Sequence, residues 1–447
     1  MQQTRKTPTF NMKAVVQETG IRPDTLRAWE RRYSLPNPDR TTGGHRIYSQ
    51  RDVDTLKWLM ARQEEGLSIS HAVDLFNRLE EEGQDPLLAS AYGSPVDSAD
   101  QLTRIGAGDS INEMRDAWLT ACRAFDEPAA NRILAEAFAL FPVEQVCVEL
   151  LQKGMAMFGQ GWYEGEATVQ QEHFASALAM RQMDALLAAS PKATRPGKVL
   201  LGCPPEEEHT FGLLLMAVLL RRRGLDAVYL GANVPTEQLA LTIESVRPRL
   251  AIFLAQHLIS AAELGQVGDF LADEQLPLAY GGRIFLENPS LRGRIEGHYL
   301  GDDLLGAASE AEKLVGRSER PTPVEPLPEE YGAALNHFIS RRAALESALT
   351  TTLAVGGQAP DQFASAGEFL TRNVTAALKL GDIDLVTPEV EWIGGLLGKR
   401  QLDPELLIIY LAAYRQALID TLDERGQIII DWLDRLLERF RLQSQSA

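Results

Sequence analysis

The sequence predicts a multidomain protein made of α and α/β segments. Its 447 residues are enough for roughly three domains of about 150 residues each. Helical spacing of apolar residues runs through 109–192 and 330–447, whereas short strand-like apolar runs alternate with helical runs over 193–316. The segments 84–108 and 317–329 are rich in Pro, Gly, Ser or charge and are typical of linkers. We therefore expect separate folded parts rather than one core.

Composition limits the class of protein. Hydrophobic residues make up 45% of the chain. No run approaches the ~20 apolar residues of a membrane-spanning helix, and "MQQTRKTPTF" lacks a signal-peptide core, so we expect a cytoplasmic protein without a membrane partner. Cys122, Cys147 and Cys203 are far apart and odd in number, which argues against a disulfide framework or a thiolate metal cage. We expect all three to be ordinary buried residues.

Positive charge is concentrated at the amino terminus. The whole chain carries -18, but residues 1–62 contain 12 Lys or Arg and 6 Asp or Glu, a net +6 that leaves -24 for the rest. Within 1–83, "NMKAVVQETG" and "RPDTLRAWERRYS" fit two short helices, and "TTGGHRIYSQRDVDTLKWLM" fits a Gly-Gly turn, a strand and a further helix. Together these elements predict a winged helix-turn-helix.

The second helix and the wing carry the candidate DNA contacts. Arg27 and Arg31 share a helix face through their four-residue spacing, while Leu26 and Trp29 can pack inward. The first turn of this helix would face base edges in a major groove, and the wing would contact the phosphate backbone. The expected DNA-binding residues are Arg22, Thr25, Arg27, Arg31, Tyr33, Arg40, His45, Arg46 and Tyr48.

This segment resembles a known family. "RAWERRYSLPNPDRTTGGHRIYSQRDVDTL" is similar to the DNA-binding domain of MerR-type transcription regulators, and its "RAWERRY" and "GGHRIYS" elements resemble the light-sensing subgroup typified by CarH. The resemblance implies a transcription regulator that binds double-stranded operator DNA as a homo-oligomer, either a dimer or a tetramer.

Residues 109–192 predict a four-helix bundle, because four helical runs follow one another with short joints. Trp162 follows "FGQG" at the end of the third run, and Glu172 with His173 lies at the start of the fourth. A tryptophan near a helix end is usually a core residue, and a Glu-His pair is usually solvated. Taken singly, these residues leave both a structural and a ligand-binding role open.

Residues 193–316 predict a doubly wound, Rossmann-like parallel sheet of about five strands, from "GKVLLG", "LDAVYLG", "PRLAIFLA", "LPLAYGG" and "EGHYLG". The loop after the first strand has no GxGxxG nucleotide fingerprint but contains Glu207-x-His209-x-x-Gly212. An imidazole nitrogen is a good ligand for cobalt, and a carboxylate on the other nitrogen fixes the tautomer. Gly212 would let the helix start approach a large planar ring.

This loop resembles the motif of cobalamin-binding domains. The resemblance implies that His209 replaces the cofactor's own base and ligates the cobalt from below, with Glu207 as its hydrogen-bonding partner. It also implies that the cofactor's nucleotide tail enters the sheet near Ala255, Gln256, Leu258, Gly281 and Gly282. Many relatives have a serine where this chain has Ala255.

The spacing of Trp162 from Glu172 and His173 resembles the motif with which CarH-like photoreceptors cap adenosylcobalamin. The resemblance implies that Trp162 covers the adenosyl group and that Glu172 and His173 contact it. It further implies that photolysis of this chromophore changes the oligomeric state and the DNA affinity. One position departs from that family, in which the residue after the tryptophan is a histidine, because this chain has Tyr163.

Two other functions fit parts of the pattern. A MerR-type regulator that senses another small ligand would keep the basic segment but would not need Trp162, Glu172, His173 and His209 together. A corrinoid carrier of a methyltransferase system would use the bundle and the sheet but not the basic segment. The sequence contains no recognisable set of nucleophile, base and oxyanion donors, so we do not expect an enzyme.

Residues 330–447 consist of amphipathic helices and support two interpretations. They could form an oligomerisation bundle. Alternatively, they resemble a globin-like second sensor, as in photocobilins, which pair cobalamin with biliverdin. The candidate bilin pocket would be lined by His337, Arg341, Arg342, Trp392, Tyr410 and Tyr414, and no cysteine beyond Cys203 could tether a bilin covalently.

Overall fold

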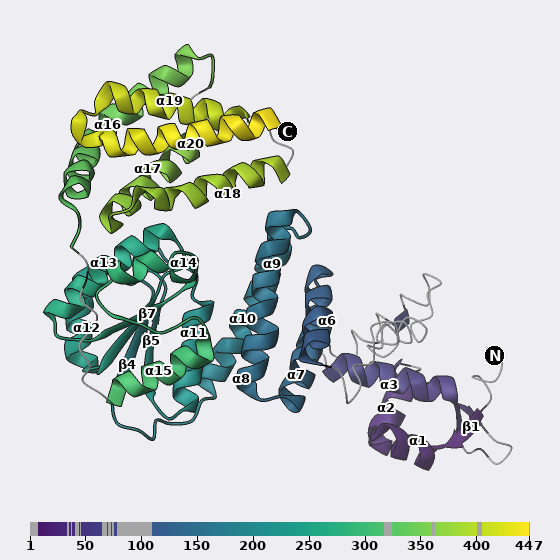
Figure 1. Ribbon diagram of the computed structural model, residues 1–447. Helices are drawn as coiled ribbons and strands as arrows, with labels where there is room; N and C mark the ends of the chain where they lie inside the picture. Colours follow the sequence, from purple (N-terminus) through teal and green to yellow (C-terminus); the bar gives the residue numbers. More distant parts are fainter. Residues whose placement is uncertain are drawn as a thin grey trace. The chain divides into compact units, whose positions relative to one another are not determined.

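The computed structural model describes residues 8–33, 35–36, 38–40, 44, 46–64, 69, 73, 76–77, 110–316, 324, 326–359, 363–399 and 405–446 (Figure 1). The chain divides into two compact units, residues 1–108 and 109–447. Most of the two expected linkers lies outside the described residues. Among the described residues, no helix is both long and apolar enough to cross a membrane.

The first unit has the elements of a winged helix-turn-helix. Asn11 caps α1 by accepting a hydrogen bond from the Ala14 amide, and Gly20 ends that helix in the left-handed region at φ 74°. A strand that the pattern did not predict, β1, pairs antiparallel with β3 and places Phe10 opposite Tyr48. The elements are β1 (Pro8–Asn11), α1 (Met12–Thr19), α2 (Pro23–Tyr33), β2 (Asp39–Arg40), β3 (Arg46–Ser49) and α3 (Gln50–Glu64). Leu26 and Trp29 are buried in its core, as their positions in α2 predict.

The second unit begins with the expected bundle. Capping boxes start its first and last helices, in which Ser110 and Thr168 pair with Glu113 and Gln171. The third predicted helix is interrupted by a π-helical segment, which the apolar spacing did not indicate. The elements are α6 (Ile111–Arg123), α7 (Glu127–Leu140), α8 (Val143–Gln145), η2 (Val146–Gln152), α9 (Lys153–Glu164) and α10 (Val169–Ala188).

A five-stranded parallel sheet follows, in the order β5-β4-β6-β7-β8. The strands are β4 (Lys198–Gly202), β5 (Asp226–Gly231), β6 (Leu250–Leu254), β7 (Leu278–Gly281) and β8 (His298–Tyr299). The helices around them are α11 (Phe211–Arg222), α12 (Leu239–Val246), α13 (Leu258–Asp273), α14 (Arg283–Glu287) and α15 (Leu304–Gly316). This confirms the doubly wound sheet. The strand order reverses between β4 and β6, where such sheets bind their ligands.

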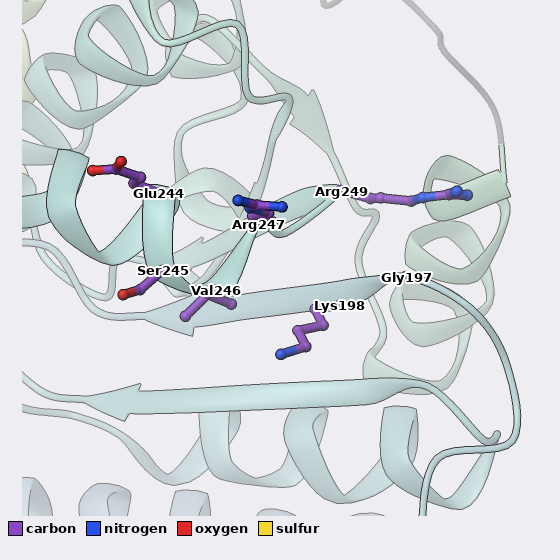
Figure 2. A pocket seen from close by; sticks show the side chains of 7 residues that line it. All are labelled: Gly197, Lys198, Glu244, Ser245, Val246, Arg247 and Arg249. Atoms are coloured by element: carbon purple, nitrogen blue, oxygen red, sulfur yellow. The ribbon is translucent and has the colours of Figure 1, made fainter.

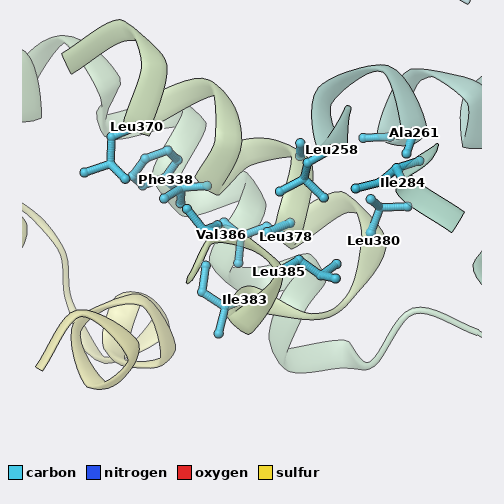
Figure 3. Packing of buried hydrophobic residues seen from close by; sticks show 14 of the residues in the cluster. Leu258, Ala261, Ile284, Phe338, Leu370, Leu378, Leu380, Ile383, Leu385 and Val386 are labelled. Atoms are coloured by element: carbon cyan, nitrogen blue, oxygen red, sulfur yellow. The ribbon is translucent and has the colours of Figure 1, made fainter. Parts of the chain in front are cut away.

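The carboxyl-terminal helices share a hydrophobic core with the sheet. Leu258 and Ala261 of α13 and Ile284 of α14 belong to the same buried cluster as Phe338 and Leu380 (Figure 3). These helices are α16 (Glu329–Val355), α17 (Ala364–Leu380), α18 (Val386–Lys399), α19 (Glu405–Thr421) and α20 (Gln427–Ser446). The packing of α17 on α13 therefore fixes this helical part against the sheet.

The three cysteines are ordinary buried residues, as expected. All three thiols are free and buried. Burial raises the pKa of each thiol to about 12, so none is a thiolate near neutral pH.

Candidate functional site

The loop between β4 and α11 lies at the point where the strand order reverses. Its turn is fixed by the β5–α12 connection, because Asn233 Oδ1 accepts a hydrogen bond from the Glu206 amide at 2.7 Å. The Asn233 amide in turn donates to the Glu207 carbonyl oxygen at 3.0 Å. The loop is thereby held at the carboxyl edge of the sheet, with Glu207 turned inward and His209 outward.

Glu207 is fully buried and saturated with hydrogen bonds. Its Oε1 accepts from the His209 amide at 2.9 Å and lies 2.8 Å from His209 Nδ1. Its Oε2 accepts from the Gln256 amide at 2.6 Å and from the Ser260 hydroxyl at 2.7 Å. Burial alone would raise the pKa of Glu207, but these hydrogen bonds outweigh it and lower the pKa to about 2. All four lone-pair positions are used, so Glu207 orients a ligand rather than binding a metal itself.

His209 presents a ring nitrogen to the space outside the loop. Its side chain is 65% exposed, and its Nδ1 faces Glu207. Because an ionised carboxylate can only accept, Nδ1 carries the proton and Nε2 keeps a free lone pair. The hydrogen bond to Glu207 raises the pKa of His209 and increases the basicity of its imidazole. An imidazole held in this tautomer fits axial ligation of cobalt.

The structure adds two side chains that the motif did not predict. His257 Nε2 lies 3.1 Å from His209 Nδ1, and Ser260 supplies the hydroxyl on Glu207. Glu207, His209 and His257 thus bring three ligand-type groups within 4.8 Å of one another. Both added residues follow β6 in "AQHLIS", and two polar residues after a buried strand were the available signal.

The expected tail-binding residues are only partly brought together. The Gln256 amide bonds to Glu207, but Leu258 is buried in the core shared with the carboxyl-terminal helices and does not face His209. Ala255 is buried, and its amide donates to the Gly281 carbonyl oxygen at 3.1 Å. At Gly282, with φ 123°, a Cβ would collide with the Ala255 carbonyl oxygen, so the close approach of these two strand ends requires glycine.

At Gly212, unlike at Gly282, packing within the described residues does not require a glycine. A Cβ there would lie 3.5 Å from Leu254 Cδ1, which is an ordinary contact.

Glu172 and His173 lie at the start of α10, in the α9–α10 corner. Glu172 Oε2 lies 2.8 Å from His173 Nδ1, and Glu172 Oε1 accepts from the Ser176 hydroxyl at 2.5 Å. The His173 side chain is 75% exposed. The charge of Glu172 is among the causes that raise the pKa of His209, so the bundle carboxylate lies within electrostatic reach of the imidazole.

The end of α9 also contacts α18. Trp392 packs against Trp162, with ring centroids 6.0 Å apart, and stacks on Tyr163 at 5.6 Å. Lys399 Nζ lies 4.4 Å from the centre of the Tyr163 ring. A Cβ at Gly395 would collide with the Tyr163 hydroxyl, so glycine permits this approach. Trp392 therefore belongs to the contact with the bundle.

The candidate DNA residues divide into exposed and buried groups. Arg22, Arg27, Arg31 and Arg40 are exposed, and Thr25 and Tyr33 are half-buried. Arg46 Nε pairs with Glu30 Oε2 at 2.7 Å, which offsets part of its charge. His45 lies outside the described residues.

Tyr48 corrects the prediction for the wing. It is 0% exposed, and its hydroxyl donates to Glu30. The phenol therefore supports the wing from inside and offers no group to DNA. The pattern could not show this, because the partner that satisfies the hydroxyl lies in α2.

The candidate bilin residues do not form one group. Tyr410 and Tyr414 are buried together, with ring centroids 6.2 Å apart, while Arg341 and Arg342 are exposed. The buried His337 accepts from the Asp423 amide at 3.2 Å. Within the described residues, the buried Tyr410 hydroxyl has no hydrogen-bond partner.

An open hollow of about 750 Å³ lies at the opposite edge of the sheet (Figure 2). It is lined by Gly197, Lys198, Glu244, Ser245, Val246, Arg247 and Arg249. Lys198 begins β4 and Arg249 precedes β6, so this hollow is at the amino ends of the strands, away from His209.

Comparison with known proteins identifies the family. Residues 10–79 match the family described as MerR HTH family regulatory protein, and residues 114–187, from α6 to α10, match the B12 binding domain. The chain is 34% identical over 240 residues to the HTH-type transcriptional repressor CarH of Myxococcus xanthus, which is 54% of this chain and 76% of CarH. The chain belongs to the CarH family.

A second relative from the same organism is the HTH-type transcriptional repressor CarA. It is 30% identical to this chain over 243 residues, which is 54% of this chain and 74% of CarA. Among solved structures, the monomethylamine corrinoid protein of Methanosarcina barkeri is similar with a TM-score of 0.39 and 19% identity, over 46% of this chain and 100% of that one. This CarH-family chain is thus a MerR-type transcription regulator with a B12 binding domain. MerR-type regulators bind DNA, cobalamin is the cofactor of the B12 binding domain, and the relatives are regulators.

Proposed function

We propose that this CarH-family regulator is light-responsive and uses adenosylcobalamin as its chromophore, bound between the His209 loop and the α9–α10 corner. The observation that carries the proposal is the exposed His209 imidazole, whose Nδ1 lies 2.8 Å from the fully buried Glu207 carboxylate and whose Nε2 keeps a free lone pair. Glu172 of the bundle lies within electrostatic reach of this imidazole. No single packing role explains Glu207, His209, Glu172 and Trp162 together.

On the lower face, His209 Nε2 would ligate the cobalt. Glu207 holds the proton on Nδ1, which keeps the ring in the ligating tautomer before the cofactor arrives. The Gln256 amide and the Ser260 hydroxyl keep Glu207 ionised and fixed. The lower site is therefore preorganised, and little side-chain entropy is lost on binding.

On the upper face, Trp162 would pack on the adenosyl group, and Glu172 and His173 would contact its polar atoms. Bound adenosylcobalamin supplies a cobalt-carbon bond that visible light breaks. Loss of the adenosyl group would remove one packing contact of Trp162 and leave its contact with Trp392, and the α9–α10 corner would shift to a second arrangement. Tyr163 is held against Gly395 and Lys399 of α18. We therefore do not expect Tyr163 to bind the cobalt in place of the histidine that the family has at this position.

The proposed output is operator binding. Residues 1–83 would bind double-stranded DNA through Arg22, Arg27, Arg31 and Arg40, and a homo-oligomer would present two or more such readers. We propose that the shift at α9–α10 changes the oligomeric state and so the DNA affinity. Oligomers gain affinity because the second reader binds at high effective concentration.

For the carboxyl-terminal helices we propose a second sensor with biliverdin as its chromophore, and oligomerisation as the alternative. The buried, unpartnered Tyr410 hydroxyl among the described residues favours a ligand, because such a group is costly unless something bonds to it. Phe363 stacks on Tyr410 with centroids 5.5 Å apart and would supply an aromatic wall. The contact of α18 with Trp162 and Tyr163 would couple this part to the cap.

An absorption spectrum of the full chain tests these proposals. The protein is reconstituted with adenosylcobalamin in the dark, illuminated with green light, and followed by gel filtration; a parallel sample receives biliverdin. We expect a bound corrinoid spectrum that changes on illumination together with the elution volume. If the corrinoid binds but its spectrum does not change in light, the proposed light response is refuted. If no corrinoid binds, the result favours a regulator that senses another ligand. A biliverdin sample without a red-shifted band would count against the second chromophore.

A further inference from the structure

His257 lies against His209 although it is not part of the Glu-x-His motif. Its Nε2 is 3.1 Å from His209 Nδ1, and the ring centroids are 4.7 Å apart at an interplanar angle of 65°. Oε1 of Glu207 lies 2.8 Å from the same Nδ1. One nitrogen of His209 therefore faces two side-chain atoms.

Valence decides which of these atoms carries the proton. The ionised Glu207 can only accept, so His209 Nδ1 must donate. A proton on His257 Nε2 would point at this N–H, so His257 must accept through Nε2 and carry its own proton on Nδ1. The arrangement is one N–H shared between two acceptors that approach it from different sides.

The backbone holds His257 in this place. His257 is the extended residue before α13, with φ -128° and ψ 161°, and its amide donates to Ser260 Oγ at 3.2 Å. The same hydroxyl lies 2.7 Å from Glu207 Oε2. Ser260 therefore links the backbone of His257 to the Glu207 carboxylate.

We propose that His257 is a positioning residue for cobalt ligation by His209. A single acceptor on Nδ1 fixes the tautomer but leaves the ring plane free to tilt. A second acceptor outside the first direction restricts that tilt and directs the Nε2 lone pair along one line. The proposal rests on the proposed function, because it concerns the ligand that His209 would provide.

Electron paramagnetic resonance of the full chain loaded with cobalamin reduced to the Co(II) state tests this role. The protein is labelled with ¹⁵N-histidine, because the nuclear spin then separates a histidine ligand, a doublet, from the cofactor's own ¹⁴N base, a triplet. His257→Phe keeps the ring volume without an acceptor, and His257→Gln restores an acceptor. His298→Gln is the control, since it changes a half-buried histidine on β8, the edge strand of the sheet.

We expect a doublet in the wild type, a mixture of ligated and unligated cobalt in His257→Phe with about tenfold weaker cobalamin binding, and recovery in His257→Gln. His298→Gln should leave the signal unchanged. A His257→Phe signal and affinity equal to the wild type would overturn this inference alone. A wild type without the doublet would overturn ligation by His209 as well. Circular dichroism checks folding, and if His257→Phe does not fold, a His257→Gln signal unlike the wild type would refute the acceptor role.

Discussion

The two sides of the candidate cobalamin site are built differently. On the sheet side, a fully buried carboxylate accepts four hydrogen bonds from three residues on two segments and fixes one exposed imidazole. On the bundle side, Glu172 bonds to His173 and Ser176 of its own helix, and Trp162 and Tyr163 pack on Trp392 of α18. Polar networks of the first kind are rigid because every change leaves a buried group unpaired. Aromatic packing at a helix end can shift at lower cost, which suits a moving part.

The sharpest test of this contrast is the stability of the protein without cofactor. Glu207→Gln should lower the free energy of unfolding at pH 7 by roughly 3 kcal/mol, because the pKa of Glu207 is held at about 2 in the folded state. The ordinary glutamate pKa is higher, so this contribution is complete above about pH 4.5 and is lost as the pH falls toward 2. Denaturant unfolding of both proteins across this range measures it. Glu172→Gln is the matched control and should change stability by less than about 1 kcal/mol.

Ligand binding should show the next largest effect. His209→Ala should weaken cobalamin binding about 100-fold, roughly 2.7 kcal/mol, and remove the spectral features of histidine ligation. His173→Ala should weaken binding only a few-fold, since its side chain is exposed on the bundle. Titration followed by absorption checks both. Equal losses for the two histidines would contradict the distinction between a fixed and an adaptable face.

The bundle side should dominate the response to light instead. Trp162→Ala should retain most cobalamin binding but lose at least half of the light-induced change in elution volume, because it removes the ring that would pack on the proposed adenosyl group. Gel filtration in the dark and after green light measures this. An unchanged light-induced shift in elution volume in Trp162→Ala would show that Trp162 does not take part in the light response.

The smallest effect is expected at α18. Trp392→Ala removes a 42% exposed ring that packs on Trp162 and Tyr163, and should change the light-induced shift in elution volume by about two- to threefold. Val355→Ala, which trims a more exposed residue of α16, is the control and should have no effect. Identical behaviour of the two variants would show that α18 does not influence the cap.

Much of the fold could be predicted because its signals are local. The apolar spacing of the bundle, the strand-like runs of the sheet and the Glu207-x-His209 spacing each fall within a short window, and the structure has these elements. Strand β1 and the π-helical segment were missed, since one depends on pairing with β3 and the other on packing within the bundle. Tyr48 was misplaced for the same reason, because Glu30 on another element satisfies its hydroxyl.

By itself, the sequence determined the order of the parts, the basic DNA reader and the strand-end loop with its carboxylate and imidazole. These depend on neighbours in the chain, whose spacing fixes which face a side chain shares. Only the tertiary structure decided that His257 lies beside His209 and Ser260 bonds to Glu207, that Leu258 is buried in the core, and that Trp392 packs on Trp162. Those contacts join residues far apart in sequence, and their free energy is gained only when the strands and helices pack together.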